Sequence, residues 1–237
     1  RADCDAVAYL SHRRALRAQH EGRFTSVVPI KTPSGSVSLD ECIRPSLTAE
    51  RLAAMPPAFL TLGAAGSDAV QLSQYPGLTK ITHVHTAGNS PAMCDAAAVL
   101  LVGSKMLASD QGLTPKVRIV DSVTCCGEPL EVVSGCVAAT KAILSRNKLS
   151  PSDVDVFEIH EAFAATIVKL QRELEIDSAR LNINGGCIAL GHPMGATGAI
   201  MAGTAIDELM RCDGSIGIIA ASGAAGSGSA LLVERCY

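Results

Sequence analysis

The sequence predicts an α/β fold. In the second half of the chain, short runs that favour β-strands alternate with longer runs of helical periodicity. Apolar residues make up 48% of the 237 residues and aromatic residues only 3%, so the core must consist of small aliphatic side chains. Together with 21 glycines, this composition suits closely packed layers of helices and sheet. The length allows one large domain or two small ones.

The first third of the chain is expected to combine helices with loops. An apolar stripe opposite several arginines predicts the first helix, which Gly22 ends. Pro56 and Pro57 stop the second helix, because proline cannot continue one. The helices expected in this part lie at residues 1–21, 48–55 and, within a Gly- and Ala-rich loop, 68–74.

Regular elements become denser from Lys80, where we expect a boundary. Residues 81–86 favour a strand, and Asn89 or Ser90 can cap a helix that runs from Pro91 to about residue 108. The run 150–153 has the pattern of a capping box. The other expected elements are strands at 117–123, 154–159, 181–183, 216–221 and 229–234, and helices at 137–147, 161–175 and 196–211.

Charge and cysteine content exclude several classes of function. The net charge is −3 without a long basic run, so nucleic acid is not an expected partner. No apolar run reaches the roughly 18 residues of a membrane span. Nine cysteines without zinc-like spacing indicate reduced thiols in the cytoplasm, or in an organellar matrix if the source is eukaryotic. The start at Arg1, without methionine or a signal peptide, suggests a piece of a longer chain.

Three loops that follow expected strands carry polar side chains. His160 and Glu161 end a buried strand, His192 lies in the glycine-rich string Asn182–Gly198, and Ser222 begins a hairpin. Strand ends of open α/β sheets commonly bind ligands, and loops on a rigid sheet commonly supply the site. Each side chain also has a structural interpretation: a helix-capping or core histidine, a charge in the first turn of a helix, and an ordinary turn serine.

Other residues give weaker signals. His83 and His85 alternate on one face of an expected strand, but no third metal ligand lies nearby, so we predict no metal site. Cys187 is a possible nucleophile, although a cysteine between Gly186 and Ile188 is more often a small buried hydrophobic residue.

Taken together, these residues resemble the thiolase family of acyl-CoA acyltransferases. Residues Asn182–Gly198 match every fixed position of the family's string Asn-x-x-Gly-Gly-x-x-Ala-x-Gly-His-Pro-x-Gly-x-x-Gly. His160–Phe163 is similar to its Asn/His-Glu-Ala-Phe motif, Thr86–Ser90 to its Thr-Ala-Gly-Asn turn, and Arg1–Asp5 to the start of a loop-domain helix.

The resemblance implies a layered α-β-α-β-α fold. Residues 1–79 would form part of a loop domain that contacts coenzyme A, and residues 80–112 the last strand and helix of the N-terminal half. Residues 113–237 would form an intact C-terminal half. Full-length relatives assemble into dimers and tetramers, so a homo-oligomer is expected for the full-length protein.

The resemblance also implies roles for individual residues. In the family one cysteine attacks the acyl group and a second cysteine moves protons. His192 would be the base, and His160 would help to form an oxyanion hole, where preorganised donors stabilise developing charge. Acyl-CoA or coenzyme A would be a substrate, with no further cofactor. The residues implied to contact it are Arg44, Phe59, Ser90, Ala162 and Phe163.

The sequence departs from the family pattern at three places. It contains no Cys-Ser-Ser/Ala-Gly motif for the nucleophile, and Ser222 stands where relatives have the second cysteine. Pro91–Ala92 replaces a common Ser-Gly. Because a serine hydroxyl is a much poorer proton shuttle than a thiol, we expect weak or no turnover from this chain alone. The alternatives are a non-catalytic protein or subunit that binds acyl-CoA, and a condensing enzyme of the ketoacyl-synthase type.

Overall fold

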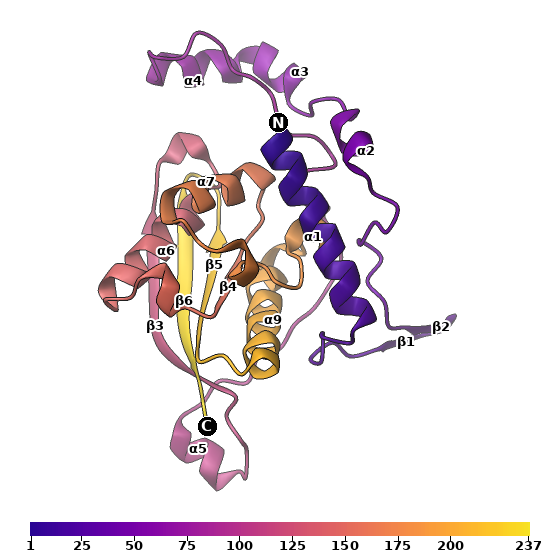
Figure 1. The fold of residues 1–237 in the computed structure, drawn as a ribbon, viewed down its shortest axis with the longest axis vertical. Coiled ribbons are helices and arrows are strands. Elements are labelled where there is room, and N and C mark those ends of the chain that lie inside the picture. Colours follow the sequence, from indigo (N-terminus) through magenta and orange to yellow (C-terminus); the bar gives the residue numbers. More distant parts are fainter.

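A four-stranded mixed sheet forms the centre of the computed structural model, which describes residues 1–237 (Figure 1). The strand order is β3-β6-β5-β4. The two central strands pair antiparallel with each other, β3 pairs antiparallel with β6, and β4 pairs parallel with β5. The strands are β3 (Val117–Cys126), β4 (Val156–Ile159), β5 (Ile216–Ser222) and β6 (Ser227–Arg235).

Helices cover both faces of this sheet, because successive strand side chains point to opposite sides. In β5, Ile218 packs into the larger core with α6 (Gly135–Arg146) and α7 (Ala164–Leu174). The next residue, Ile219, packs into a second core with α9 (Thr197–Cys212). The result is an α/β/α arrangement, which confirms the α/β fold expected from the alternation of strands and helices.

The long helix α1 (Ala2–His20) lies across α7 and the short helix α8 (Cys187–Leu190). Three of its buried positions are alanines: Ala8, Ala15 and Ala18 are fully buried. They let the glycine-rich string approach so closely that a Cβ at Gly185 would lie 2.6 Å from the Ser11 carbonyl oxygen. Only glycine fits at this contact, where φ is also +81°.

The remaining elements are short. In Figure 1, α3 and α4 stand away from the sheet beyond the N-terminus of α1, and β1 and β2 form a small antiparallel ribbon. None of the helices is both long and apolar enough to cross a lipid bilayer. These elements are β1 (Ile30–Thr32), β2 (Gly35–Val37), α2 (Ala49–Ala53), α3 (Leu60–Leu62), α4 (Asp68–Gln74), α5 (Lys105–Asp110), a π-helical turn at Gly63–Ser67, and 3₁₀ turns at Pro129–Glu131, Pro151–Asp153, Ser178–Arg180 and Met194–Ala196.

The strand expected at residues 81–86 is absent. Its backbone groups bond elsewhere: the Ala58 N–H donates to the His85 carbonyl at 2.8 Å, and the Asn89 side-chain amide donates to the Val84 carbonyl at 3.0 Å. With no strand beside it to pair with, this segment stays extended but irregular.

The helix expected from Pro91 to residue 108 is also wrong, since only α5 at its end is helical. The apolar side chains of the segment find no surface to pack against, and Val99 and Leu101 are 93% and 80% exposed. A helix gains most of its stability from packing its apolar face, so periodicity alone does not form one here.

Most expected elements of the second half are confirmed, with shifted ends. The strand at 181–183 reduces to a single bridge between Leu181 and Phe157. The helix expected from Glu161 begins only at Ala164, so Glu161 is not in its first turn. The capping box at Ser150–Asp153 is present.

Candidate active site

His160 lies at the carboxyl end of β4, where the sheet meets α7. Its N–H donates to the Ala220 carbonyl at 2.8 Å, which continues the parallel pairing beyond the strand. Asn182 clamps the preceding residue: its Oδ1 accepts from the Ile159 N–H at 2.8 Å and its Nδ2 donates to the Ile159 carbonyl at 2.9 Å. The imidazole is 3% exposed, and neither ring nitrogen has a well-formed hydrogen bond.

His192 is held in the turn between α8 and α9. Its N–H donates to the Ala92 carbonyl at 2.8 Å, and its Nδ1 lies 2.8 Å from the Thr197 hydroxyl, in the first turn of α9. If Nδ1 carries the proton, it donates a hydrogen bond to the Thr197 hydroxyl, and Nε2 keeps a free lone pair. This is the arrangement that a general base requires.

The two imidazoles lie against each other. Their ring centroids are 4.5 Å apart and the rings are inclined by 43°. Burial, and secondarily the neighbouring His192, lowers the pKa of His160 to about 4. Burial also lowers the pKa of His192. Both rings are therefore neutral near pH 7, so either can accept a proton.

Ser222 ends β5 beside the ring of His160. Its backbone lies close to the imidazole of His160 and raises the pKa of that ring. The effect is smaller than that of burial, which lowers the pKa. The Ser222 hydroxyl oxygen accepts a hydrogen bond of 2.9 Å from the Cys136 N–H, in the first turn of α6. A helix N-terminus stabilises negative charge, so this contact favours a partial charge on the oxygen.

Two glycines let the hairpin approach α6. A Cβ at Gly228 would lie 2.0 Å from the Gly135 carbonyl oxygen, and a Cβ at Gly135 would lie 2.0 Å from the Ser227 carbonyl oxygen. Both obstacles are backbone atoms, so no side-chain movement relieves them. The position of Ser222 thus depends on backbone contact that only glycine permits.

Glu161 joins the loops beneath the imidazoles, a role that the sequence did not indicate. Its carboxylate accepts from the Ser11 hydroxyl at 2.7 Å, from the Asn182 side-chain amide at 3.0 Å and from the Ile188 N–H at 3.0 Å. Ser11 in turn accepts from the Gly186 N–H at 3.0 Å. The carboxylate therefore connects α1, β4 and the glycine-rich string, and burial raises its pKa.

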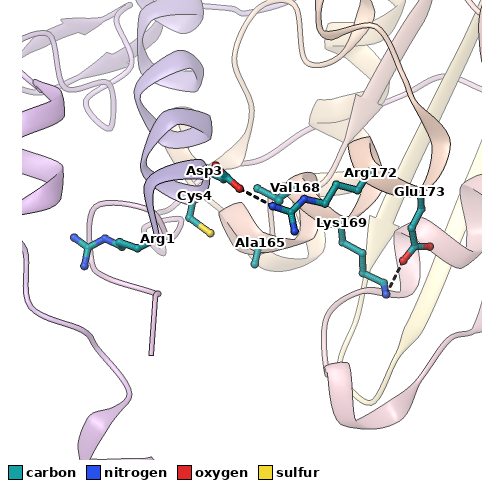
Figure 2. Close-up of a pocket in the computed structure, with 8 residues that line it drawn as sticks. All are labelled: Arg1, Asp3, Cys4, Ala165, Val168, Lys169, Arg172 and Glu173. Atoms are coloured by element: carbon teal, nitrogen blue, oxygen red, sulfur yellow. Dashed lines mark hydrogen bonds and ion pairs between the residues drawn. The ribbon is translucent and has the colours of Figure 1, made fainter. Parts of the chain in front are cut away.

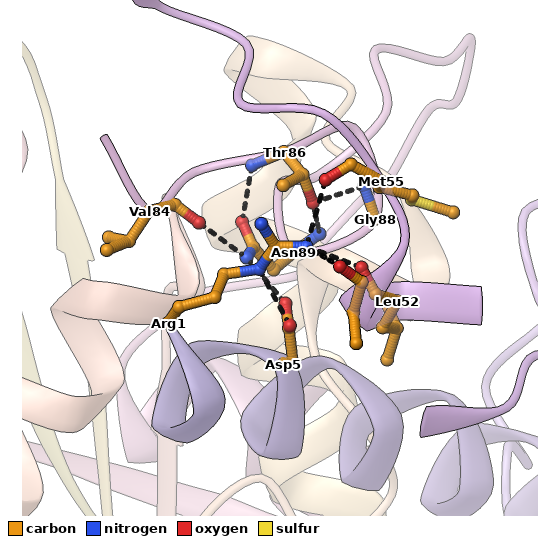
Figure 3. A network of polar contacts seen from close by, with 9 residues as sticks. Arg1, Asp5, Leu52, Met55, Val84, Thr86, Gly88 and Asn89 are labelled. Carbon is orange, nitrogen blue, oxygen red and sulfur yellow. Dashed lines mark hydrogen bonds and ion pairs between the residues drawn. The ribbon is translucent and has the colours of Figure 1, made fainter. Parts of the chain in front are cut away.

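The Thr86–Ser90 turn is fixed from below by α1 (Figure 3). The Asn89 side chain accepts from the Thr86 N–H at 2.8 Å and donates to the Asp5 carboxylate at 2.9 Å. Arg1, which pairs with Asp5 at 2.7 Å, donates to the Met55 carbonyl at 3.1 Å. Figure 3 shows these side chains converging between α1 and the turn.

Two of the residues expected to contact coenzyme A, Phe59 and Phe163, pack together, and the other three lie in separate surroundings. Phe59 and Phe163 pack edge to face at 5.8 Å between centroids, with His85 4.8 Å from Phe163. Ala162 is buried beside His160. The Ser90 hydroxyl is buried without a partner, and Arg44 reaches the Ala87 carbonyl only at 3.4 Å.

His85 was not expected at this site, because sequence spacing placed it with His83 on a strand face. The two histidines face different partners: His83 lies 3.0 Å from the Asp68 carboxylate, whereas His85 packs against the two phenylalanines. Cys187 is buried, and burial together with Glu161 raises its pKa, so it is a poor nucleophile.

A cavity of about 420 Å³ lies away from the imidazoles (Figure 2). It opens between α1 and α7, and its charged side chains are already paired: Arg172 with Asp3 at 2.6 Å and Lys169 with Glu173 at 2.7 Å. Figure 2 shows no histidine in its lining. We therefore do not assign it to the candidate site.

Comparison with known proteins identifies related sequences over the whole chain. The sequence profile described as "Thiolase, N-terminal domain" matches residues 1–106, and "Thiolase, C-terminal domain" matches residues 113–235. The 3-oxoadipyl-CoA/3-oxo-5,6-dehydrosuberyl-CoA thiolase of Escherichia coli K12 is 37% identical over 99% of this chain and 56% of its own length. The 3-ketoacyl-CoA thiolase of Klebsiella pneumoniae is 35% identical over 98% of this chain and 57% of its own length.

Solved structures agree with these matches. The acetyl-CoA acetyltransferase of Bacillus anthracis superposes with a TM-score of 0.83 at 34% identity, over 99% of this chain and 56% of that one. Human mitochondrial 3-ketoacyl-CoA thiolase gives a TM-score of 0.80 at 28% identity, again over 99% and 56%. The chain thus spans a little over half the length of the relatives it matches.

Proposed function

The chain belongs to the thiolase family and has its fold, and from this premise we propose that it serves acyl transfer between CoA thioesters. The reaction would be thiolytic cleavage of a 3-ketoacyl-CoA or condensation of acetyl-CoA. The observation that carries the proposal is the contact between two neutral imidazoles, 4.5 Å apart, beside the backbone of Ser222.

His192 is the proposed general base. Its Nδ1 is engaged by Thr197, which fixes the ring and leaves Nε2 to take a proton from an attacking thiol. His160, whose ring nitrogens make no well-formed hydrogen bond in a buried site, would donate a hydrogen bond to the thioester oxygen as negative charge develops there. An unsatisfied buried imidazole is costly, and a ligand oxygen would remove that cost.

Ser222 is the proposed proton carrier in place of a cysteine. The Cys136 N–H stabilises its oxygen, but a hydroxyl still has a pKa far above that of a thiol. We therefore propose that this chain alone is impaired or inactive in turnover. The sequence also contains no Cys-Ser-Ser/Ala-Gly motif to supply the nucleophile.

The pantetheine arm of coenzyme A would lie along the aromatic rings of Phe59 and Phe163. Phe59 and Phe163 offer an apolar surface to the pantetheine, and the Ser90 hydroxyl offers an unused hydrogen bond. Arg44 would contact the nucleotide end, because its planar guanidinium pairs well with phosphate.

We propose residues 1–79 as part of a loop domain, residues 80–112 as the end of the N-terminal half and residues 113–237 as the C-terminal half. We also propose that the full-length protein forms homo-oligomers and is located in the cytoplasm.

The second candidate is a non-catalytic protein or subunit that binds acyl-CoA. The replacement at Ser222 favours it, because binding needs the imidazoles and aromatic rings but not a second thiol. Calorimetric titration with coenzyme A, together with acetoacetyl-CoA thiolysis by the full-length gene product, separates the two. Binding with a CoA-dependent rate supports acyl transfer, binding without a rate supports the second candidate, and no binding rejects both.

Two histidine variants extend this experiment, one as the test of the base and one as its matched control. His192→Ala should abolish any thiolysis, since it removes the proposed base. His20→Ala, an exposed position at the end of α1, should leave the rate unchanged. Equal rates in the two variants would reject His192 as the base.

A further inference from the structure

Two cysteines from distant parts of the chain meet at the turn that carries His192. A Cβ built on Gly191 would lie 2.5 Å from the Cys94 sulfur and 3.0 Å from the Cys42 sulfur. The two sulfurs can be no further apart than those two distances combined. Both cysteines are free, and both residues are only partly buried.

Each cysteine lies next to a part of the candidate site. Cys42 is two residues before Arg44, in a loop that the His12 ring holds through the Arg44 N–H at 3.1 Å. Cys94 follows Met93, which forms a parallel bridge with His192. A bond between the sulfurs would tie the Arg44 loop to the segment that supports His192.

We propose that Cys42 and Cys94 are a modification site, a thiol pair that an oxidised low-molecular-weight thiol converts reversibly to a disulfide. A thiolate of one cysteine attacks the small disulfide and releases one small thiol, which leaves a mixed disulfide. The second cysteine then displaces the other small thiol and forms the protein disulfide. One small disulfide is reduced, two protein thiols are oxidised, and two small thiols are released.

The surroundings of the pair agree with this chemistry. The sulfurs must approach to about 2.05 Å, and neither cysteine lies in a helix or strand, so no regular backbone hydrogen bonding has to break for them to approach. Burial, Asp40 and the nearby Cys94 raise the pKa of Cys42 to about 11, so the thiol is protonated at pH 7. Oxidation should therefore be slow at pH 7 and faster at pH 9, because the thiolate is the reactive form.

Peptide mapping tests the proposal directly. Trypsin places Cys42 in Thr32–Arg51, because the Arg44–Pro45 bond resists cleavage, and Cys94 in Ile81–Lys105; neither peptide contains another cysteine. After incubation with oxidised glutathione, mass spectrometry should find these two peptides linked, and dithiothreitol should separate them. If both stay available to iodoacetamide, or bond to other cysteines instead, the proposal is wrong.

Variants and a stability measurement complete the test. Cys42→Ser and Cys94→Ser should each abolish the linked peptide, whereas Cys212→Ser, at an exposed cysteine, should keep it. Oxidation should raise the melting temperature of the parent and of Cys212→Ser by on the order of 5–10 °C, because the bond closes a long loop. An equal rise in Cys94→Ser would contradict the pairing. None of these readouts depends on the proposed acyl transfer.

Discussion

Gly186→Ala should destabilise the chain strongly, because the new methyl group would meet the carboxylate of Glu161. A Cβ at Gly186 would lie 2.4 Å from the Glu161 Cδ and 2.6 and 2.7 Å from its two oxygens. Packed Cβ atoms do not approach so closely, so the carboxylate must move. The backbone itself, at φ −128° and ψ −162°, accepts alanine without strain.

The expected loss follows from the hydrogen bonds that the carboxylate must release. It accepts from Ser11, Asn182 and Ile188, and all three donors are buried or nearly so. Each buried donor left without a partner costs about 1–3 kcal/mol. A displacement that breaks two of the three bonds therefore costs about 2–6 kcal/mol of the free energy of unfolding.

Gly198→Ala is the matched control within the same glycine-rich string. It lies in α9, and a Cβ there meets no atom within 4 Å. Alanine should stabilise the helix by about 0.4–1 kcal/mol. Urea unfolding followed by far-ultraviolet circular dichroism measures both variants. If Gly186→Ala unfolds at the same urea concentration as the parent, Glu161 does not hold the loops as described.

Three further predictions concern the imidazoles, the turn and the hairpin. Burial lowers the pKa of His160 and of His12 to about 4 from an ordinary 6.5, so the unfolded chain binds more protons between these values. Stability should therefore fall as the pH drops from 6.5 to 4, by at most about 3 kcal/mol for each ring, as measured by urea unfolding across that range. Asn89→Ala should cost about 2–4 kcal/mol in the same assay, because it leaves the Thr86 N–H and the Val84 carbonyl without their partner and Asp5 paired only with Arg1. Ser222→Cys should raise acetoacetyl-CoA thiolysis by the full-length gene product by about tenfold or more, because a thiol transfers protons more readily.

Exposed positions provide the controls for these three predictions. His20→Gln should leave the pH dependence of stability unchanged, whereas His160→Gln should reduce it. Gln111→Ala should not alter stability, since its side chain is exposed beyond α5. Ser229→Cys, on β6, should not raise thiolysis. A pH dependence unaffected by His160→Gln, or equal rates in both serine variants, would contradict the assigned roles.

The second half of the fold could be predicted because its local patterns agree with its packing. The strand at 216–221 is a continuous run of apolar residues and glycine, and the one at 154–159 is mostly apolar. The structure buries both between helices on the two faces of the sheet. The segment 81–108 could not be predicted in the same way. Its periodicity favours a strand and a helix, but no strand pairs with residues 81–86, and the apolar side chains of residues 99–102 are exposed.

The candidate site shows the same division. His160, His192 and Ser222 could be found from motifs, since each lies at or just after the end of a strand or short helix. The contacts of His160 with His192 and with the Ser222 backbone, and the role of Glu161, depend on distances between residues far apart in sequence. The approach of His85 to Phe163, and of Cys42 to Cys94, has no sequence signal at all, because it follows from the path of the irregular segments.

The most direct test of the central claim is a titration of the chain, labelled with ¹³C at histidine, with acetyl-CoA. The six histidine signals are assigned by substitution and followed by nuclear magnetic resonance. If a thioester binds beside the two imidazoles, the signals of His160 and His192 shift together while that of His20 stays fixed. If acetyl-CoA binds and moves neither ring, the site lies elsewhere and the assignment of acyl transfer to these residues is contradicted.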